Sequence, residues 1–452
     1  MYDLSCFKAY DLRGKVPDQL NSDIANRVGR AFVEVMGAKK VVVGHDIRLS
    51  SKALAEALIE GLMAAGADVY DIGLCGTEHI YFSTAHYQMD GGIVVTASHN
   101  PKDYNGMKMV GPGSRPLSSD NELMTIKETV NRDFIDAKAR GNREALEFMP
   151  DYIAHLMSYV NPERLKRLNI VVNAGNGGAG AVIDSLEPHV PFSFIKLHHE
   201  PDGNFPNGVP NPLLPENREV TTKAVQASNA DFGIAWDGDF DRCFLFDETG
   251  RFIEGYYIVG LLAQQFLKSH PGAAIVHDPR LTWNTQEIVL NNGGSPIESK
   301  TGHAFIKATM REQDAVYGGE MSAHHYFKKF FYCDSGMIPW LMIAELICET
   351  GQTLSSLIDE RISLYPASGE INRTIADAPS AISLIESRYN DSAKAISKTD
   401  GLSMDFDNWR FNLRMSNTEP LVRLNVESRR DGNLMRAKTE EIIGLLDTVA
   451  TS

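Results

Sequence analysis

The chain presents a serine at the end of an expected strand, in Val94-Val95-Thr96-Ala97-Ser98-His99-Asn100-Pro101. The apolar run Gly92-Ile93-Val94-Val95 predicts a buried strand, and Pro101 prevents the strand from continuing. Ser98 is therefore expected on a tight turn beside His99 and Asn100. Its hydroxyl could bond nearby backbone, as serines in turns do, or it could carry a group through a reaction. Motifs further along the chain favour the second interpretation.

The chain contains three similar strand–helix–strand patterns, one before this turn and two after it. Each has a short apolar run, apolar residues at helical spacing and a second strand, at 39–73, 168–197 and 272–298. The repetition predicts three related α/β domains with mixed sheets, each containing a parallel strand pair. The last segment changes to alternating strands and closes with an amphipathic helix at 434–449, which predicts a smaller α+β domain.

Irregular segments suggest where the domains meet. The charged stretch 131–143 places one boundary near 145, and the third pattern fades at Tyr365-Pro366. We expect domains at 1–145, 146–250, 251–365 and 366–452. The second domain also contains a Pro-, Asn- and Gly-rich loop at 201–215, which is long enough to be functional.

Composition narrows the class of protein. The chain has 452 residues and a formal net charge of −15, which argues against a general nucleic-acid binder. Its five cysteines are scattered, so neither a disulfide framework nor a zinc site is supported. The N-terminus has no signal-peptide pattern, and no apolar run reaches the roughly 18 residues of a membrane span. We expect a cytoplasmic protein without a membrane segment.

A glycine-rich stretch, 175–180, invites comparison with dinucleotide-binding loops. It follows an expected strand and contains the spacing Gly175-x-Gly177-x-x-Gly180. The next strand ends near Lys196 and His198 instead of the acidic residue that binds a ribose. A tight helix-entry turn is the favoured interpretation.

The strongest local signal is the acidic stretch Asp237-Gly238-Asp239-Phe240-Asp241-Arg242, between two expected strands. Carboxylates at alternate positions in a turn can point at one hard cation, and crowded carboxylates repel one another without one. The acidic spacing resembles an EF-hand loop, but Arg242 replaces the required glycine and strands replace the flanking helices. Oxygen-only ligation favours Mg²⁺ when a phosphate completes the shell.

Three further polar stretches could bind a sugar phosphate. In Gly319-Glu320-Met321-Ser322-Ala323-His324, the polar residues alternate and would share one face of an extended segment. His303 follows Lys300-Thr301-Gly302 at an expected helix start, where an anion could bind and a histidine could transfer protons. The stretch Arg414-Met415-Ser416-Asn417-Thr418-Glu419-Pro420 contains the parts of a phosphate cradle. With Ser98 and the acidic loop, these stretches predict phosphoryl transfer on a phosphosugar.

These motifs resemble those of the α-D-phosphohexomutase family. The serine turn resembles the family's phosphoserine loop, and the stretches at 237–242, 319–324 and 414–420 match its metal, sugar and phosphate loops, in the family's order. Phe7–Gly14 and Lys300–His303 match lesser motifs. The resemblance implies a four-domain enzyme around a central cleft, with a mobile fourth domain. Within the family, the Ser416-Asn417-Thr418 loop and the segment from Ala323 to Gly336 resemble bacterial phosphomannomutases that supply GDP-mannose.

The resemblance also implies a mechanism. Ser98 carries a phosphate in the resting enzyme, and Asp237, Asp239, Asp241 and a phosphate oxygen on Ser98 hold Mg²⁺. Mannose 1-phosphate and mannose 6-phosphate interconvert through a hexose 1,6-bisphosphate, which is also the expected activator. Substrate-binding residues implied by the family motifs are Arg13, Arg242, Glu320, Ser322, His324, Arg414, Ser416, Asn417 and Thr418. His303 would manage the hydroxyl proton, with His99 or Lys108 as alternatives.

The sequence leaves alternatives for both the substrate preference and the type of activity. The substrate preference could instead be that of a phosphoglucomutase or a dual-specificity phosphohexomutase, because mannose and glucose look alike at their 3- and 4-hydroxyls. A phosphatase would release inorganic phosphate without isomerisation, and a phosphosugar sensor would keep the cradle without transfer. We expect a phosphosugar as the binding partner, and a monomer or weak homodimer.

Overall fold

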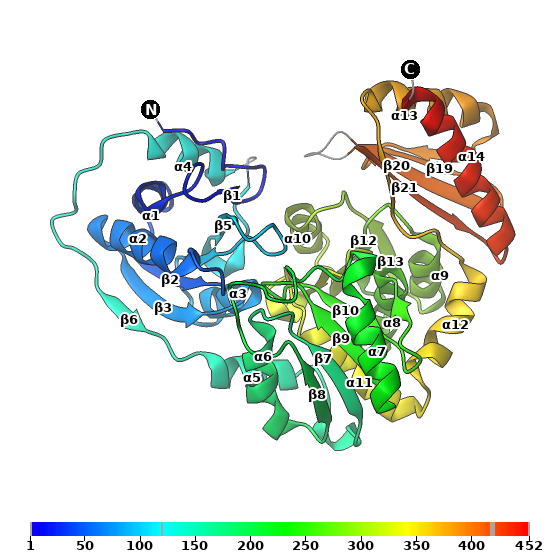
Figure 1. Ribbon diagram of the computed structural model, residues 1–452, viewed down its shortest axis with the longest axis horizontal. Helices are drawn as coiled ribbons and strands as arrows, with labels where there is room; N and C mark the ends of the chain where they lie inside the picture. The colour runs from blue at the N-terminus through cyan, green and yellow to red at the C-terminus, as the bar shows by residue number, and fades with distance from the viewer. Residues whose placement is uncertain (1, 119–120, 416–420, 451–452) are drawn as a thin grey trace. The chain divides into compact units, whose positions relative to one another are not determined.

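The computed structural model describes residues 2–118, 121–415 and 421–450. The chain forms two compact units. Figure 1 traces their elements from the N-terminus in blue to the C-terminus in red. Unit 1 comprises Met1–Phe252 and Tyr326–Gly351, and unit 2 comprises Ile253–His325 and Gln352–Ser452. None of the helices in the described part of the chain combines the length and apolarity that a membrane span needs.

Unit 1 begins with a six-stranded sheet of order β1-β5-β4-β2-β3-β6. Strand β2 pairs in parallel with β3 on one side and with β4 on the other, as the strand–helix–strand pattern predicted. Strand β1 starts at Leu12, and Phe7 forms an isolated antiparallel bridge with that residue. The elements are β1 (Leu12–Lys15), α1 (Ser22–Met36), β2 (Lys40–His45), α2 (Ser51–Ala64), β3 (Asp68–Leu74), α3 (Thr77–His86), β4 (Gly91–Val95), β5 (Tyr104–Val110), α4 (Glu122–Val130) and β6 (Arg143–Ala145).

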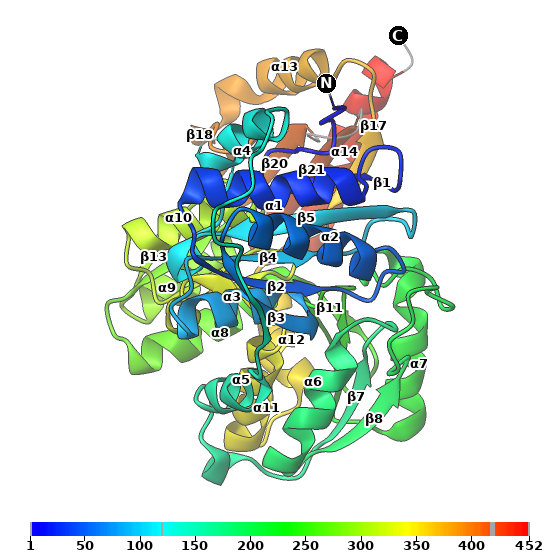
Figure 2. The same cartoon turned by 90° about the vertical axis from the view of Figure 1, so that its left-hand side faces the viewer.

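Helices cover both faces of this sheet. Figure 2 shows α1 and α2 across the face turned toward the viewer. A side chain at Gly91 would collide with Phe32 of α1, whereas one at Gly92 would collide with Thr84 and Ile80 of α3. Since neighbouring strand residues point to opposite faces, α1 and α3 lie on opposite sides of β4. The two glycines let both helices pack close to the strand that leads to Ser98.

The second sheet of unit 1 has the order β11-β10-β9-β7-β8. Its central strand β7 pairs in parallel with β8 and β9, and β9 continues through the acidic loop into antiparallel β10. The elements are α5 (Met149–Met157), β7 (Asn169–Asn173), α6 (Ala179–Leu186), β8 (Ser193–Leu197), α7 (Glu219–Ser228), β9 (Phe232–Trp236), β10 (Cys243–Phe246) and β11 (Phe252–Ile253).

A later segment of the chain, 326–351, returns to unit 1. It follows β15 (His325–Phe327) through β16 (Cys333–Asp334) into α11 (Ile338–Thr350). The backbone N–H of Gly336 donates to the buried Glu78 carboxylate at 2.7 Å, and the Gly336 carbonyl accepts from the Trp236 indole at 2.9 Å. This return segment therefore satisfies buried polar groups of helix α3 and strand β9.

Unit 2 contains a third parallel arrangement, in which β12 pairs with β13 on one side and β14 on the other. The order β13-β12-β14 matches β3-β2-β4 and β8-β7-β9, so the three related α/β segments are confirmed. The elements are α8 (Gly255–Ser269), β12 (Ala274–His277), α9 (Trp283–Asn291), β13 (Ser295–Glu298), α10 (His303–Glu312), β14 (Tyr317–Gly319) and α12 (Leu354–Leu364).

The C-terminal sheet, also in unit 2, has the order β17-β21-β20-β19-β18, and its paired strands are antiparallel. Its core includes Phe411 and Leu424 from the strands, Ile385 from α13 and Ile442 from α14. The elements are β17 (Ile371–Thr374), α13 (Ala378–Tyr389), β18 (Ala395–Ser397), β19 (Leu402–Asp405), β20 (Trp409–Met415), β21 (Leu421–Ser428) and α14 (Gly432–Ala450). The predicted α+β segment is thus confirmed. Short 3₁₀ helices occur at Pro112–Ser114, Pro162–Arg164, Glu187–His189, Pro215–Asn217, Lys328–Phe330 and Asn390–Ser392.

Candidate active site

Ser98 occupies the turn after β4, as the sequence predicted. It is 4% exposed and has a left-handed backbone with φ of 48°, which is costly for a residue other than glycine. Its hydroxyl donates to Asp237 Oδ2 at 2.9 Å and lies 3.0 Å from His99 Nδ1. The turn therefore directs Ser98 at the acidic loop, which is 139 residues later in the chain.

The acidic loop is fixed by the aromatic residue inside it. Phe240 is fully buried with φ of 43°, and its ring lies so close to Gly76 and Gly178 that neither could carry a side chain. The loop backbone also approaches the serine turn, since a side chain at Gly238 would meet the Ser98 carbonyl at 2.6 Å. The two loops are thus held in direct backbone contact within unit 1.

The three aspartates of the loop converge. Asp237, Asp239 and Asp241 are nearly or fully buried, and each offers an oxygen such that the three oxygens lie within 4.8 Å of one another. Among the described residues, no group donates a hydrogen bond to Asp239 Oδ1 or Asp241 Oδ1, although both atoms are buried. Buried carboxylate oxygens without donors fit a hard cation, so these residues could hold Mg²⁺.

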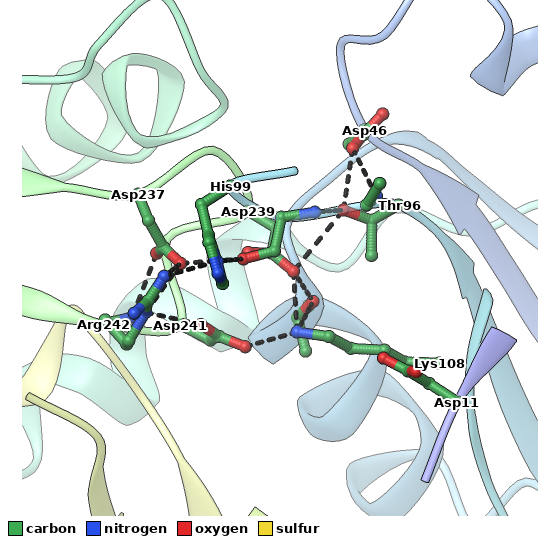
Figure 3. Close-up of polar contacts among 12 residues, drawn as sticks. Asp11, Asp46, Thr96, His99, Lys108, Asp237, Asp239, Asp241 and Arg242 are labelled. Atoms are coloured by element: carbon green, nitrogen blue, oxygen red, sulfur yellow. Dashed lines mark hydrogen bonds and ion pairs between the residues drawn. The ribbon is translucent and has the colours of Figure 1, made fainter. Parts of the chain in front are cut away.

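Cationic side chains neutralise the remaining carboxylate oxygens (Figure 3). Lys108 Nζ lies 2.8 Å from Asp239 and 2.5 Å from Asp241, and Arg242 donates to Asp237 Oδ2 through Nε at 2.9 Å. Burial opposes the charged form of Lys108, but the two aspartates outweigh it and raise its pKa. Lys108 is therefore a fixed cation here, which suits charge neutralisation better than proton abstraction.

His99 is held neutral between Ser98 and Arg242. Burial, Arg242 and Arg13 lower its pKa well below the usual value. Arg242 can only donate, so its 2.7 Å contact makes His99 Nδ1 an acceptor. Arg13, the other expected phosphate ligand of unit 1, donates to Asp11 at 2.8 Å and to Asn100 of the serine turn at 3.3 Å. All the expected site residues of the first two α/β segments therefore surround one turn.

In unit 2, the stretch after β14 is a tight turn and not the extended segment that alternation suggested. Glu320 N donates to the His324 carbonyl at 2.9 Å, and Ala323 N donates back to the Glu320 carbonyl at 3.0 Å. Ala323 has φ of 69°, which an extended segment excludes. The expectation that Glu320, Ser322 and His324 share one strand face was therefore wrong.

The expected proton-transfer residue of unit 2 lies next to the sugar loop. His303 begins α10, and the N–H of the preceding Gly302 donates to Glu320 Oε1 at 3.0 Å. The Ser322 hydroxyl accepts from Arg280 at 3.3 Å. The structure thus brings Glu320, Ser322 and the start of α10 together.

An arginine cluster lies at the edge of the C-terminal sheet. The Glu370 carboxylate accepts from Arg414 at 3.1 Å and Arg423 at 3.0 Å, and Arg280 lies 3.5 Å away. Burial and the nearby Arg280 lower the pKa of Arg414, while Glu370 opposes that shift. Ser416, Asn417 and Thr418 lie outside the described residues.

Sequence reasoning missed several charged residues of both units: Asp46, Arg48, Asp278 and Arg280 are buried, and Glu370 and Arg423 are half-buried. A signal for four of them is present, since His45-Asp46-Ile47-Arg48-Leu49 and His277-Asp278-Pro279-Arg280-Leu281 share the pattern His-Asp-x-Arg-Leu. In each case the pattern follows the central strand of a parallel arrangement.

Comparison with known proteins gives the family. Models of phosphoglucomutase/phosphomannomutase match four stretches: alpha/beta/alpha domain I at 5–135, domain II at 150–250, domain III at 254–365 and the C-terminal domain at 370–443. The chain belongs to the phosphoglucomutase/phosphomannomutase family. Membership accounts for the three similar parallel arrangements and for the different last sheet.

Similar members of the family cover the chain from end to end. A protein of Xanthomonas campestris pv. campestris named phosphohexose mutases is 58% identical over 98% of this chain and 99% of its own length. A phosphomannomutase of Salmonella montevideo is 58% identical over 99% of this chain and 100% of its own length. A crystal structure of a family protein from Burkholderia thailandensis is 32% identical, with a TM-score of 0.89, and covers 99% of this chain and 98% of that one.

Proposed function

We propose that the chain is a phosphomannomutase, an isomerase that interconverts mannose 1-phosphate and mannose 6-phosphate for GDP-mannose synthesis. The observation that carries this proposal is the 2.9 Å contact between the Ser98 hydroxyl and Asp237, in a loop with two donor-free carboxylate oxygens. A phosphate on Ser98 would stand beside that loop. A phosphosugar mutase needs a phosphorylated side chain because it must remove a phosphate from one oxygen of the sugar and add a phosphate to another oxygen.

The reaction has two transfers between Ser98 and the sugar. In the first, the free hydroxyl of the hexose phosphate attacks phosphorus, the bond from phosphorus to Ser98 Oγ breaks, and hexose 1,6-bisphosphate forms. In the second, Ser98 Oγ attacks the other phosphate of the bisphosphate, which restores the phosphoserine and releases the isomer. In each transfer the attacking hydroxyl loses a proton and the leaving oxygen takes one up, first Ser98 Oγ and then the sugar oxygen, so atoms and charge balance.

Asp237, Asp239 and Asp241, with a phosphate oxygen on Ser98, would hold Mg²⁺. The bound ion would make the phosphorus more electrophilic and offset charge during transfer. Arg13 and Arg242 would neutralise the transferring phosphate, and Lys108 would hold the loop carboxylates. These roles are supported by the contacts of Lys108 with Asp239 and Asp241 and of Arg242 with Asp237.

Unit 2 would bind the sugar and its non-transferring phosphate. Glu320, Ser322 and His324 would read sugar hydroxyls, and Arg414 with Ser416, Asn417 and Thr418 would bind the phosphate. We assign proton transfer to His303, because its helix start is tied to Glu320 through Gly302. His99 is less suited, since its Nδ1 already accepts from Arg242.

We further propose domain boundaries near 145, 250 and 365, a cytoplasmic location, and a monomer or weak homodimer. Hexose 1,6-bisphosphate would be an activator, because it re-phosphorylates Ser98 after loss of the phosphate.

The test is an assay of isomerisation on mannose 1-phosphate with Mg²⁺ and a trace of hexose 1,6-bisphosphate. Glucose 1-phosphate and glucosamine 1-phosphate are run in parallel, and free phosphate is monitored. Mannose 6-phosphate formed fastest, with little free phosphate, supports the proposal. Free phosphate without isomerisation would indicate a phosphatase and overturn it.

A second candidate is a dual-specificity phosphohexomutase. It is favoured by the 58% identical relative whose name, phosphohexose mutases, covers more than one sugar. Comparable turnover of the mannose and glucose phosphates would favour this candidate.

A further inference from the structure

Arg48 lies buried beneath the Ser98 turn. Its side chain is 1% exposed, and its two terminal nitrogens donate four hydrogen bonds to backbone carbonyls of one short stretch. Nη2 donates to Ser98 at 2.9 Å and Asn100 at 2.6 Å, and Nη1 donates to Pro101 at 2.7 Å and Tyr104 at 2.9 Å. The planar guanidinium thus spans the whole serine turn with a fixed geometry.

Asp46 orients both the arginine and the entry to the turn. Its Oδ1 accepts from the Arg48 backbone N–H at 2.9 Å, and its Oδ2 lies 3.4 Å from Arg48 Nε. The same Oδ2 accepts from the Thr96 hydroxyl at 2.7 Å (Figure 3). Thr96 Oγ1 in turn accepts from Ser98 N at 3.0 Å. A continuous hydrogen-bonded path therefore leads from Arg48 to both sides of Ser98.

The loop at 201–215 covers this arrangement. The Phe205 ring is buried and lies 5.5 Å from the Arg48 guanidinium. Gly203 packs so closely on the Ile47 carbonyl that a side chain there would meet it at 2.4 Å. The long loop that the sequence singled out thus shields the Arg48 hydrogen bonds from water, which strengthens them.

We propose that Arg48, with Asp46 and under the cover of Phe205, is a positioning residue that fixes Ser98 for phosphoryl transfer. Ser98 has a strained left-handed backbone, and such a conformation persists only where its surroundings enforce it. The Ser98 carbonyl, one of the four that Arg48 holds, also lies so close to Gly238 of the acidic loop that a side chain there would meet it at 2.6 Å. Loss of the guanidinium releases both constraints at once.

This inference rests on the proposed function, in which Ser98 carries the phosphate. It predicts an effect on transfer and not on phosphosugar affinity, because the proposed sugar and phosphate ligands lie in unit 2. A displacement of the reacting oxygen by about 1 Å can cost roughly 10²-fold in rate.

The test compares Arg48→Lys with the wild type. Unphosphorylated enzyme is mixed with labelled glucose 1,6-bisphosphate, label on Ser98 is followed in a single turnover, and the Kd for mannose 6-phosphate is measured by calorimetry. Lysine keeps the charge but cannot reach four carbonyls. We expect a fall of about 10- to 100-fold in the transfer rate with a Kd within twofold of the wild type.

Arg27→Lys is the matched control. Arg27 also donates to backbone carbonyls of the first sheet region, those of Val130 and Arg132 at 3.0 Å, away from Ser98. This variant should lose thermal stability while each folded molecule transfers phosphate at the wild-type rate. A transfer rate as low as that of Arg48→Lys would mean that the effect is a general loss of structure, and would overturn the inference.

Each outcome separates the two proposals. A wild-type enzyme that takes no label on Ser98 contradicts the proposed function. A labelled wild type with Arg48→Lys transferring within twofold of it contradicts the inference alone. If Arg48→Lys does not fold, Phe205→Leu decides, because it removes the cover and leaves every hydrogen bond. A fall of about threefold or more at unchanged Kd supports the inference, and an unchanged rate overturns it.

Discussion

The two His-Asp-x-Arg-Leu turns of the molecule begin alike and end differently. After β2, His45 Nδ1 lies 2.9 Å from the Asp46 carbonyl, and Arg48 N donates to Asp46 Oδ1 at 2.9 Å. After β12, the equivalent distances are 2.9 Å for His277 and 3.0 Å for Arg280 N. Both aspartates also accept from the neighbouring loop, from Ala97 N at 3.4 Å and from Met321 N at 2.8 Å. By strand register, Ser322 of the second copy occupies the place of Ser98.

The arginines of the two turns have different partners. Arg48 donates to four backbone carbonyls, whereas Arg280 lies 2.7 Å from Asp278, 3.6 Å from Glu320 and 3.5 Å from Glu370. Burial lowers the pKa of Arg48, but the carboxylates around Arg280 outweigh burial and raise its pKa. Carbonyl partners fix a backbone in place, while carboxylate partners can be exchanged for another anion. The same local structure thus fixes a backbone turn in the first copy and places a positive charge among carboxylates in the second copy.

The largest difference between the two turns is expected when the equivalent serines are removed. Ser98→Ala should lower kcat by about 10³-fold or more, because it removes the hydroxyl that is proposed to carry the phosphate. Ser322→Ala should cost about 10-fold, mainly in KM, since it removes one proposed hydrogen bond to a sugar hydroxyl. Steady-state kinetics of both variants provide the measurement. Comparable losses in kcat would show that the two copies share one role.

The next largest difference between the two regions is expected in their dependence on the metal. Asp241→Asn should lower kcat by roughly 10²- to 10³-fold, and chelation of Mg²⁺ should do the same to the wild type. The Kd for mannose 6-phosphate should change by less than about threefold, because its proposed ligands lie in unit 2. Asp247→Asn is the control, since Asp247 is a buried carboxylate that accepts from Thr249 N outside the loop. It should reduce stability without changing the Mg²⁺ requirement.

Arg280→Lys tests the role of the arginine in the second turn. Lysine keeps the charge but loses the planar fork, so KM for the phosphosugar should rise by about 10-fold with little change in kcat. This is the opposite split from that expected for Arg48→Lys. A fall in kcat at constant KM would show that Arg280 also positions the reacting groups.

The smallest effect concerns pH. Burial opposes ionisation of Glu370, but Arg280, Arg414 and Arg423 outweigh it and lower its pKa below the ordinary value of 4.5. Its ionised form therefore contributes stability that is fully present above about pH 4.5 and is lost as the pH falls through the lowered pKa. Glu370→Gln should flatten the acid limb of thermal stability while leaving the neutral limb parallel to the wild type. An unchanged acid limb would argue against the arginine contacts.

Sequence reasoning predicted the fold through local patterns. Apolar runs such as Val41–Val43 and helical spacing such as Leu54, Leu58 and Leu62 determine elements directly, and all these residues are buried. The acidic loop was also predictable from a local pattern, because its three carboxylates are close together both in the sequence and in the structure.

The remainder of the site depends on contacts that leave no sequence pattern. Arg48 binds backbone carbonyls, which every residue supplies, so its partners cannot be read from side chains. The alternating polar residues at Glu320–His324 predict a strand, but the segment is a turn because Ala323 has a left-handed backbone. The repeated His-Asp-x-Arg-Leu pattern was the one available signal for the buried arginines.

The return segment 326–351 has a consequence for biosynthesis. The Trp236 indole and one carboxylate oxygen of Glu78 bond with Gly336, which the chain reaches only after it has made the first part of unit 2. On the ribosome, the serine turn and the acidic loop therefore emerge long before the unit that contains them can close. A nascent chain that ended at Phe252 would expose the apolar surface that α11 covers, and this unit should recruit chaperones until Gly351 has been translated.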